Sequence, residues 1–73
     1  MEKIQSKLIQ SFAVNLRNLR EMKGYSQEEL ANRAGLDRTY VSGCERGIRN
    51  PSLLSIEKFA NALNIPAKDF LHE

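Results

Sequence analysis

The sequence has only one cysteine and one histidine, and it has no tryptophan. One cysteine excludes an internal disulfide, which suits the reducing conditions of the cytosol. One cysteine and one histidine also fall short of the four ligands of a structural zinc site, so we expect no metal. No apolar run approaches the ~18 residues of a membrane span, and the first ten residues lack the apolar stretch of a signal peptide. These absences predict a cytoplasmic protein that does not contact a membrane.

Recognisable catalytic patterns are also missing. The only histidine, His72, is next to the last residue, which excludes a credible Ser-His-Asp or Cys-His arrangement. The two aspartates fit helix caps or helix surfaces, so no pair of catalytic carboxylates stands out, and there is no glycine-rich phosphate loop. We therefore expect a protein that is not an enzyme and that has no cofactor and no small-molecule ligand.

The positive charge is small but unevenly placed. Eleven basic and nine acidic residues give a formal net charge of +2. All six arginines fall between Arg17 and Arg49, whereas the last 23 residues carry two lysines against three acidic residues. A basic central surface beside a near-neutral C-terminus indicates an anionic partner. The 73 residues predict one domain over 1–73. A chain this short buries only about 60% of its unfolded surface, so a partner subunit would add stability.

The apolar spacing predicts helices and no strands. No stretch alternates apolar and polar residues over the length of a strand, whereas steps of three and four recur. Such steps predict a first helix over about 7–22, which Gly24 is well placed to terminate. Ser26 with Glu29 three residues later is a capping-box pattern, and it predicts a second helix that Gly35 ends.

Three more helices complete the predicted fold. Asp37 is a good N-cap for a third helix that reaches about Arg46. Pro51 or Ser52 starts a fourth helix, and Pro66 can open a short fifth one. The predicted fold is therefore all-α, a compact five-helix bundle, in which the helices of residues 52–71 contribute to dimerisation.

The junction of the second and third helices has the features of a helix-turn-helix. Only residues 35–37 join the two short helices, and a turn of this length containing glycine is typical of the motif. Ala31 is small enough for the helices to approach closely, and Gly35 stands where a positive φ is expected. The inward positions of the turn and third helix are Leu36, Val41 and Cys44. The helix-turn-helix is thus expected over about 26–46, with only a narrow apolar stripe on its third helix.

The outward face of the third helix carries the candidate binding groups. These are Arg38, Thr39, Ser42 and Gly43. A recognition helix places its N-terminal residues near base edges in the major groove, where Arg38 can bond guanine. The methyl group of Thr39 can touch a thymine methyl group, and its hydroxyl can bond a base edge. Gly43 costs the helix up to about 1 kcal/mol, which a close approach of the backbone to a groove would explain.

The segment LDRTYVSGCERGIRNPS, residues 36–52, resembles the Cro/repressor-like (XRE-type) helix-turn-helix family. The resemblance extends over nearly the whole chain, from about Phe12 to Leu71. Within that family the segment is most similar to the controller proteins of restriction–modification systems. The resemblance implies a small dimeric regulator that binds double-stranded DNA, the operator.

The resemblance also implies roles for individual residues. Arg38 and Thr39 match base-reading positions, with Ser42 and Gly43 next to them. Arg20 and Glu45 match an ion pair that ties the first helix to the end of the third, which we assign to architecture. The positions that match contacts with DNA phosphates are Gln27, Tyr40, Arg46, Arg49 and Asn50.

Structural alternatives stand beside these roles. The polar outer face of the third helix could be an ordinary solvated surface. Tyr40 could be a core aromatic, and Arg49 and Asn50 could be loop residues without a contact. Cys44 fits a small buried residue better than a redox sensor.

A dimer on a palindromic operator is expected because helix-turn-helix dimers read two half-sites about 34 Å apart. The candidates for the dimer surface are Leu54, Ile65, Phe70 and Leu71, which could instead simply close the core. Ile4 and Leu8 could extend the first helix or add to that surface. The rival functions are an antitoxin or phage-type repressor of the same fold, and a protein-interaction module without DNA binding.

Overall fold

Four α-helices and one short 3-10 helix form the computed structural model, which describes residues 6–71. The elements are α1 (Lys7–Met22), α2 (Gln27–Ala34), α3 (Arg38–Glu45), α4 (Leu53–Leu63) and the 3-10 helix η1 (Ala67–Phe70). No strand occurs in this part of the chain, so the all-α prediction is confirmed. None of the helices in residues 6–71 combines the length and the apolar character that a membrane crossing requires. Ile4 and His72 lie outside the described residues.

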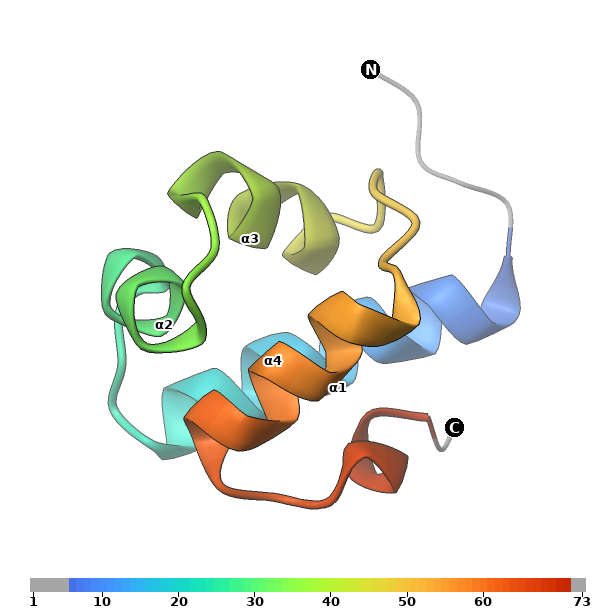
Figure 1. Ribbon diagram of the computed structural model, residues 1–73. Helices are drawn as coiled ribbons and strands as arrows, with labels where there is room; N and C mark the ends of the chain where they lie inside the picture. Colours follow the sequence, from blue (N-terminus) through green and yellow to red (C-terminus); the bar gives the residue numbers. More distant parts are fainter. Residues whose placement is uncertain (1–5, 72–73) are drawn as a thin grey trace.

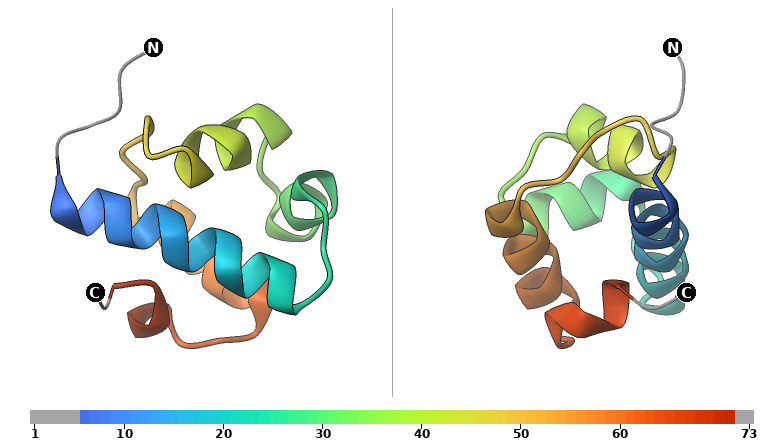
Figure 2. Two further views of the ribbon diagram at one scale, coloured as in Figure 1. Left: turned by 180° about the vertical axis from the view of Figure 1, so that it is seen from behind. Right: turned by 90° about the vertical axis from the view of Figure 1, so that its right-hand side faces the viewer.

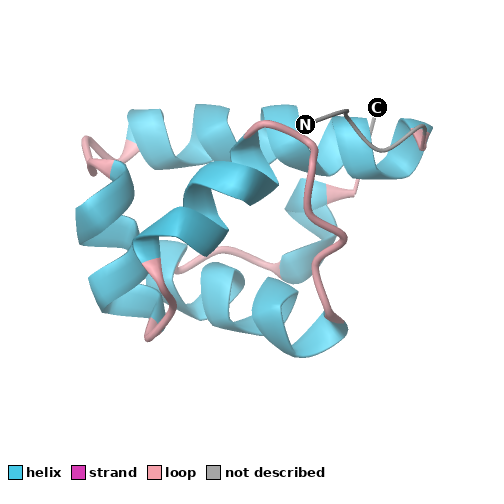
Figure 3. Cartoon of the chain, turned by 90° about the horizontal axis from the view of Figure 1, so that it is seen from above, coloured by secondary structure: helices cyan, strands magenta, loops and turns pink. Residues whose placement is uncertain are grey.

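α1 and α4 lie on opposite sides of the molecule, and the other elements close the space between them (Figure 2). α2 and α3 cover one end, whereas η1 and the loop that leads into it from α4 cover the other (Figure 1). Viewed from above, α3 lies in front of the space between α1 and α4 (Figure 3). The exposed side chains of α3 therefore belong to one end of the molecule, far from η1.

Each α-helix begins after a side chain that accepts a hydrogen bond from an N–H group of the first turn, a contact that stabilises a helix by about 1 kcal/mol. The four N-caps are Ser6, Ser26, Asp37 and Ser52. Ser26 and Asp37 were predicted as caps from the sequence and are confirmed. The start of α4 was left open between Pro51 and Ser52, and the structure has Ser52 as its N-cap. Ser26 accepts from the Glu29 N–H at 3.0 Å, but the Glu29 carboxylate accepts from Arg33 Nε at 2.7 Å. Only the serine half of the expected capping box is thus seen.

The prediction of a fifth α-helix is wrong, because residues 67–70 form a 3-10 helix instead. Asn64 ends α4 in the left-handed region, with φ 56°. Pro66 lacks an N–H group, and the four residues of η1 are too few for a ladder of α-helical hydrogen bonds. The Asp69 N–H instead donates to the Pro66 carbonyl at 3.1 Å, in the three-residue step of a 3-10 helix.

Three phenylalanine rings form the centre of the core. The ring of Phe12 lies 6.0 Å from that of Phe59 and 5.4 Å from that of Phe70, measured between centroids. Asn15 Nδ2 donates to the Phe70 carbonyl at 2.8 Å and ties η1 to α1. Phe70 is fully buried, so its expected place in the dimer surface is wrong and the alternative holds: it closes the core. The other fully buried large side chains are Leu16, Leu30, Val41, Cys44 and Leu63.

The buried thiol of Cys44 makes stability depend on pH. Burial raises the pKa of this thiol from 9.0 to about 11. Between these values the unfolded chain holds fewer protons than the folded protein, so the free energy of unfolding falls as pH rises. We expect a loss of roughly 2 kcal/mol across this range that Cys44→Ala does not share. Urea unfolding of both proteins at a series of pH values measures it, and parallel pH profiles would contradict the expectation.

Candidate nucleic-acid interface

The turn between α2 and α3 has the geometry that the sequence predicted. Gly35 is left-handed, with φ 69°, and the Leu36 N–H donates to the Ala31 carbonyl at 2.9 Å. Ala31 is buried, which lets α3 pack closely against α2. Val41 and Cys44 are fully buried on the inner side of α3. The narrow apolar stripe therefore anchors α3 from behind and leaves its other side outward.

Arg38 and Thr39 are both exposed at the start of α3. The Thr39 hydroxyl donates to Asp37 Oδ1 at 2.6 Å, and the Thr39 N–H donates to the same oxygen at 2.8 Å. These two hydrogen bonds from Thr39 lower the pKa of the Asp37 carboxyl group. Because the hydroxyl proton of Thr39 is held by the cap, the methyl group is free to contact a partner, and the hydroxyl oxygen can still accept a hydrogen bond from it.

Gly43 is buried beneath the side chain of Arg49. A Cβ atom at position 43 would lie 2.6 Å from Arg49 Cγ, closer than carbon atoms pack. The Arg49 guanidinium also lies 5.9 Å from the centroid of the Tyr40 ring, within cation–π range. The glycine thus gives the Arg49 side chain room to lie along α3. In this arrangement Arg49 stands between Gly43 and solvent, so the groove contact expected for the Gly43 backbone would need Arg49 to move.

Tyr40 is half-buried and joins α3 to α4. Its ring stacks on Phe59 with 6.5 Å between centroids and 5° between planes. Its hydroxyl donates to Ser55 Oγ at 3.0 Å, as does the Ser52 hydroxyl at the same distance. The ring therefore fits the core-aromatic alternative, while the hydroxyl lies at the edge of the α3 face. Ser55 was not predicted as part of this site; its spacing of three residues from Ser52 was the available signal.

The ion pair expected between Arg20 and Glu45 is present and bidentate. Arg20 Nε donates to Glu45 Oε2 at 2.6 Å, and Nη2 donates to Oε1 at 3.0 Å. Arg20 Nη1 donates to the Tyr25 carbonyl at 2.7 Å, and Gln27 Nε2 donates to Glu45 Oε1 at 3.1 Å. The hydrogen bonds that Arg20 donates to the Glu45 carboxylate raise the pKa of Arg20. This network joins α1, the turn after it, the start of α2 and the end of α3.

Three arginines carry the positive charge of the α3 end. Among residues 6–71 the ion pairs use Arg17, Arg20 and Arg33. The remaining arginines, Arg38, Arg46 and Arg49, are exposed on α3 and the loop after it, and Asn50 follows them, also exposed. The unpaired arginine charge of the described chain is therefore collected at one end of the molecule.

An apolar groove of about 210 Å³ lies beside this loop, between the starts of α1 and α4. Its lining includes Leu8, Leu53, Leu71, Asn50 and Pro51. Leu8 is 54% exposed, Leu53 85% and Leu71 41%, all high values for leucine.

Leu54, next to the groove in sequence, is 59% exposed, whereas Ile65 is partly buried and packs against the core. Of the residues expected at a dimer surface, Leu54 and Leu71 thus remain available. Leu53, the most exposed leucine of the groove, was not among the residues expected at a dimer surface.

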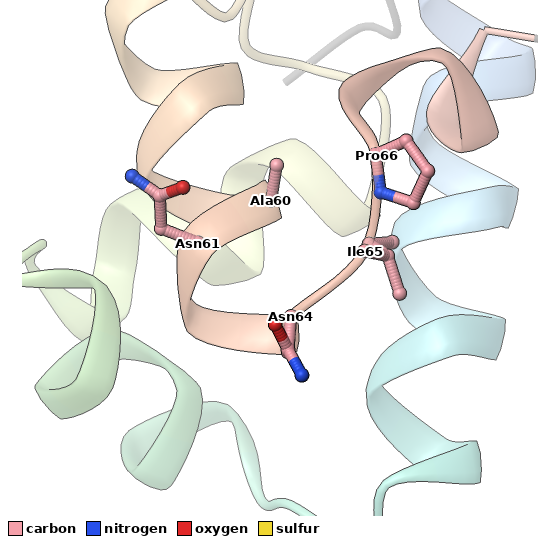
Figure 4. Close-up of a pocket in the computed structure, with 5 residues that line it drawn as sticks. All are labelled: Ala60, Asn61, Asn64, Ile65 and Pro66. Atoms are coloured by element: carbon pink, nitrogen blue, oxygen red, sulfur yellow. The ribbon is translucent and has the colours of Figure 1, made fainter.

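A second hollow, of about 350 Å³, lies where α4 passes into η1 (Figure 4). Its lining contains no ionisable side chain and consists of Ala60, Asn61, Asn64, Ile65 and Pro66. We therefore assign it no part in the recognition of an anionic partner.

Comparison with known proteins identifies a matching family and several similar proteins. The profile of the Helix-turn-helix family matches residues 16–70. A hypothetical transcription factor of Neisseria meningitidis serogroup B is 54% identical over 59 residues, which are 81% of this chain and 56% of that protein. This chain thus spans little more than half the length of that relative.

Two solved structures are similar over almost the whole chain. The restriction-modification controller protein C.AhdI from Aeromonas hydrophila matches with a TM-score of 0.84 and 51% identity, over 86% of this chain and 96% of that one. The controller protein C.Esp1396I, solved as a tetramer in complex with its natural 35 base-pair operator, matches with a TM-score of 0.84 and 36% identity. That match covers 90% of this chain and 87% of the other.

Gly43→Ala tests whether the absence of a side chain at position 43 allows Arg49 to lie along α3. We expect Arg49 to leave α3 while the free energy of unfolding changes by less than about 1 kcal/mol, because alanine's helix propensity offsets the lost packing. The NMR signals of the Tyr40 ring should shift, and Arg49→Ala should shift them in the same way. Unmoved Tyr40 signals, or a loss of more than about 2 kcal/mol in urea unfolding, would contradict this explanation of the glycine.

Proposed function

This chain belongs to the Helix-turn-helix family, and on that premise we propose that it is a sequence-specific DNA-binding transcriptional regulator. The observation that carries the proposal is the α3 end of the molecule. There the exposed arginines Arg38, Arg46 and Arg49 lie outside any ion pair of the described chain, while Val41 and Cys44 hold the helix from within. The proposal assigns no catalytic residue and no cofactor.

In the proposed complex α3 enters the major groove with its N-terminal end near the bases. Arg38 donates two hydrogen bonds to a guanine, and the Thr39 methyl group packs against a thymine methyl group. Ser42, half-buried one turn further along, is the next candidate for a base contact. The groups proposed for the phosphates are Gln27, the Tyr40 hydroxyl, Arg46, Arg49 and Asn50. Contacts of this kind release counterions, so affinity falls steeply as salt increases.

Arg38→Ala and Gln27→Ala should have different consequences. Loss of Arg38 removes a base contact, so we expect about 10- to 100-fold weaker binding to the best site and a relaxed preference at one base pair. Loss of Gln27 removes a phosphate contact, so all sequences should weaken by a similar factor. Anisotropy titrations against DNA selected from a random pool, at two salt concentrations, measure both. Equal effects of the two substitutions on every sequence would argue against this division of roles.

We further propose that the regulator is a controller of a restriction–modification system. The identity of 51% with C.AhdI supports this class, and the operator complex of C.Esp1396I supports action on an operator. The genes beside this one test the class directly. A neighbouring methyltransferase and endonuclease are expected, and a neighbouring toxin gene would point to an antitoxin instead.

We propose that the active form is a homodimer on a palindromic operator. The apolar groove and the exposed leucines around it, Leu8, Leu53, Leu54 and Leu71, are the candidate contact surface. Burial of these exposed leucine side chains against a partner would contribute about 25 cal/mol of favourable free energy per Å² of apolar surface removed from water. The groove also borders the loop that carries Arg49 and Asn50, so a partner seated there would set the spacing of two α3 helices along the DNA.

Leu53→Gln/Leu54→Gln tests this surface. Both side chains are exposed in one protomer, so the fold should persist while self-association weakens by at least ~10-fold. Sedimentation velocity over a range of concentrations measures the shift toward monomer. Met22→Gln is the matched control, because Met22 is 81% exposed at the other end of α1. Dimers of unchanged stability in the double variant would rule out this surface.

A further inference from the structure

We propose that Glu45 is a positioning residue for DNA binding: it fixes the Gln27 carboxamide as a donor to a phosphate, while Arg20 compensates its charge. The inference rests on the proposed contact between Gln27 and a phosphate. Under this proposal the Arg20–Glu45 ion pair contributes to DNA binding as well as to the stability of the fold.

The geometry of Glu45 is the first step. Its side chain is 3% exposed, at the last residue of α3, and both carboxylate oxygens accept hydrogen bonds. Oε2 accepts from Arg20 Nε at 2.6 Å, whereas Oε1 accepts from Arg20 Nη2 at 3.0 Å and from Gln27 Nε2 at 3.1 Å. Gln27 is the first residue of α2, and its side chain is thereby held across the interface between two helices.

The hydrogen-bonding chemistry of the amide is the second step. A primary carboxamide has two N–H donors and one carbonyl acceptor, and an ionised carboxylate only accepts. Glu45 therefore fixes which end of the amide faces it, because the opposite orientation would set the carbonyl oxygen of Gln27 against a carboxylate. One N–H of Gln27 is used in this contact. The second N–H diverges from it by about 120° and is left in a fixed direction for another acceptor.

Electrostatics is the third step. A phosphate bonded to that second N–H would lie within roughly 6 Å of the Glu45 carboxylate, a distance at which like charges repel strongly at a poorly solvated site. The bidentate contact with Arg20 places a positive charge directly against the carboxylate. Arg20 is itself only 12% exposed and donates to the Tyr25 carbonyl at 2.7 Å, so its positive charge is held in place beside the carboxylate. The pair thus orients the donor without repelling its target.

A double-mutant cycle on DNA affinity tests the inference. Arg20→Met/Glu45→Leu replaces the pair by apolar side chains and leaves the net charge unchanged, and such replacements of buried pairs are often tolerated. We expect Gln27→Ala to raise Kd about 10-fold in the otherwise unchanged protein, as for one charge-assisted hydrogen bond. In the apolar background the same change should raise Kd by less than about 3-fold. In a Glu21→Gln background, which alters the exposed pair with Arg17, the factor should stay near 10-fold.

The outcomes separate the inference from the function beneath it. A factor of about 10 in every background would show that Gln27 contacts DNA without help from Glu45, and would overturn the inference alone. No effect of Gln27→Ala in the unchanged protein would overturn the phosphate contact and the inference with it. Circular dichroism verifies the fold of each variant. Should the apolar pair fail to fold, Glu45→Gln takes its place. A carboxamide has one acceptor oxygen and a donor NH2 group where the carboxylate has two acceptor oxygens, so it cannot accept all three hydrogen bonds from Arg20 and Gln27, and the Gln27→Ala factor should again fall.

Discussion

The bidentate ion pair of Arg20 and Glu45 is the contact on which the arrangement of the first three helices depends. It joins the end of α1 to the end of α3, and through Tyr25 and Gln27 it also holds the turn and the start of α2. Both side chains are nearly removed from water, so loss of one partner would leave a buried charge, at a cost of about 3–5 kcal/mol. That is a large share of the stability of a chain of 73 residues, because small domains bury little surface.

The hydrophobic core is formed mainly by elements other than α3. The three phenylalanine rings and the large aliphatic residues of α1, α2 and α4 supply most of the buried volume. α3 contributes only the narrow stripe of Val41 and Cys44 together with the half-buried ring of Tyr40, and its remaining positions are polar or small. Four N-caps fix where the helices start, and the left-handed Gly35 fixes the turn between α2 and α3. Fold and interface therefore use different faces of the same short helix.

Much of the fold could be predicted because it depends on local signals. The apolar spacing, the two predicted N-caps Ser26 and Asp37, and Gly35 lie within a few residues of the features they determine. Two of the wrong or incomplete predictions depend on side-chain packing that helical spacing does not determine. Phe70 was expected at a dimer surface, but η1 packs against α1 and buries its ring. Gly43 was expected to let the helix backbone approach DNA, but the Arg49 side chain covers it. The exposure of Arg38 and Thr39 could be predicted from the helical period. The hydrogen bond from Gln27 to Glu45, 18 residues away, corresponds to no local sequence pattern and could not be predicted.

The shortness of α2 and α3 has a consequence for how the protein responds to heat. Each has eight residues, and isolated helices below ~12–15 residues are marginal in water. The recognition unit therefore exists only while the whole domain is folded, and melting and release of DNA are one transition. By mass action, a duplex that binds only the folded form raises the midpoint temperature of that transition. Each copy of the regulator that occupies its site is thereby protected from unfolding, and warming depletes the unoccupied copies first.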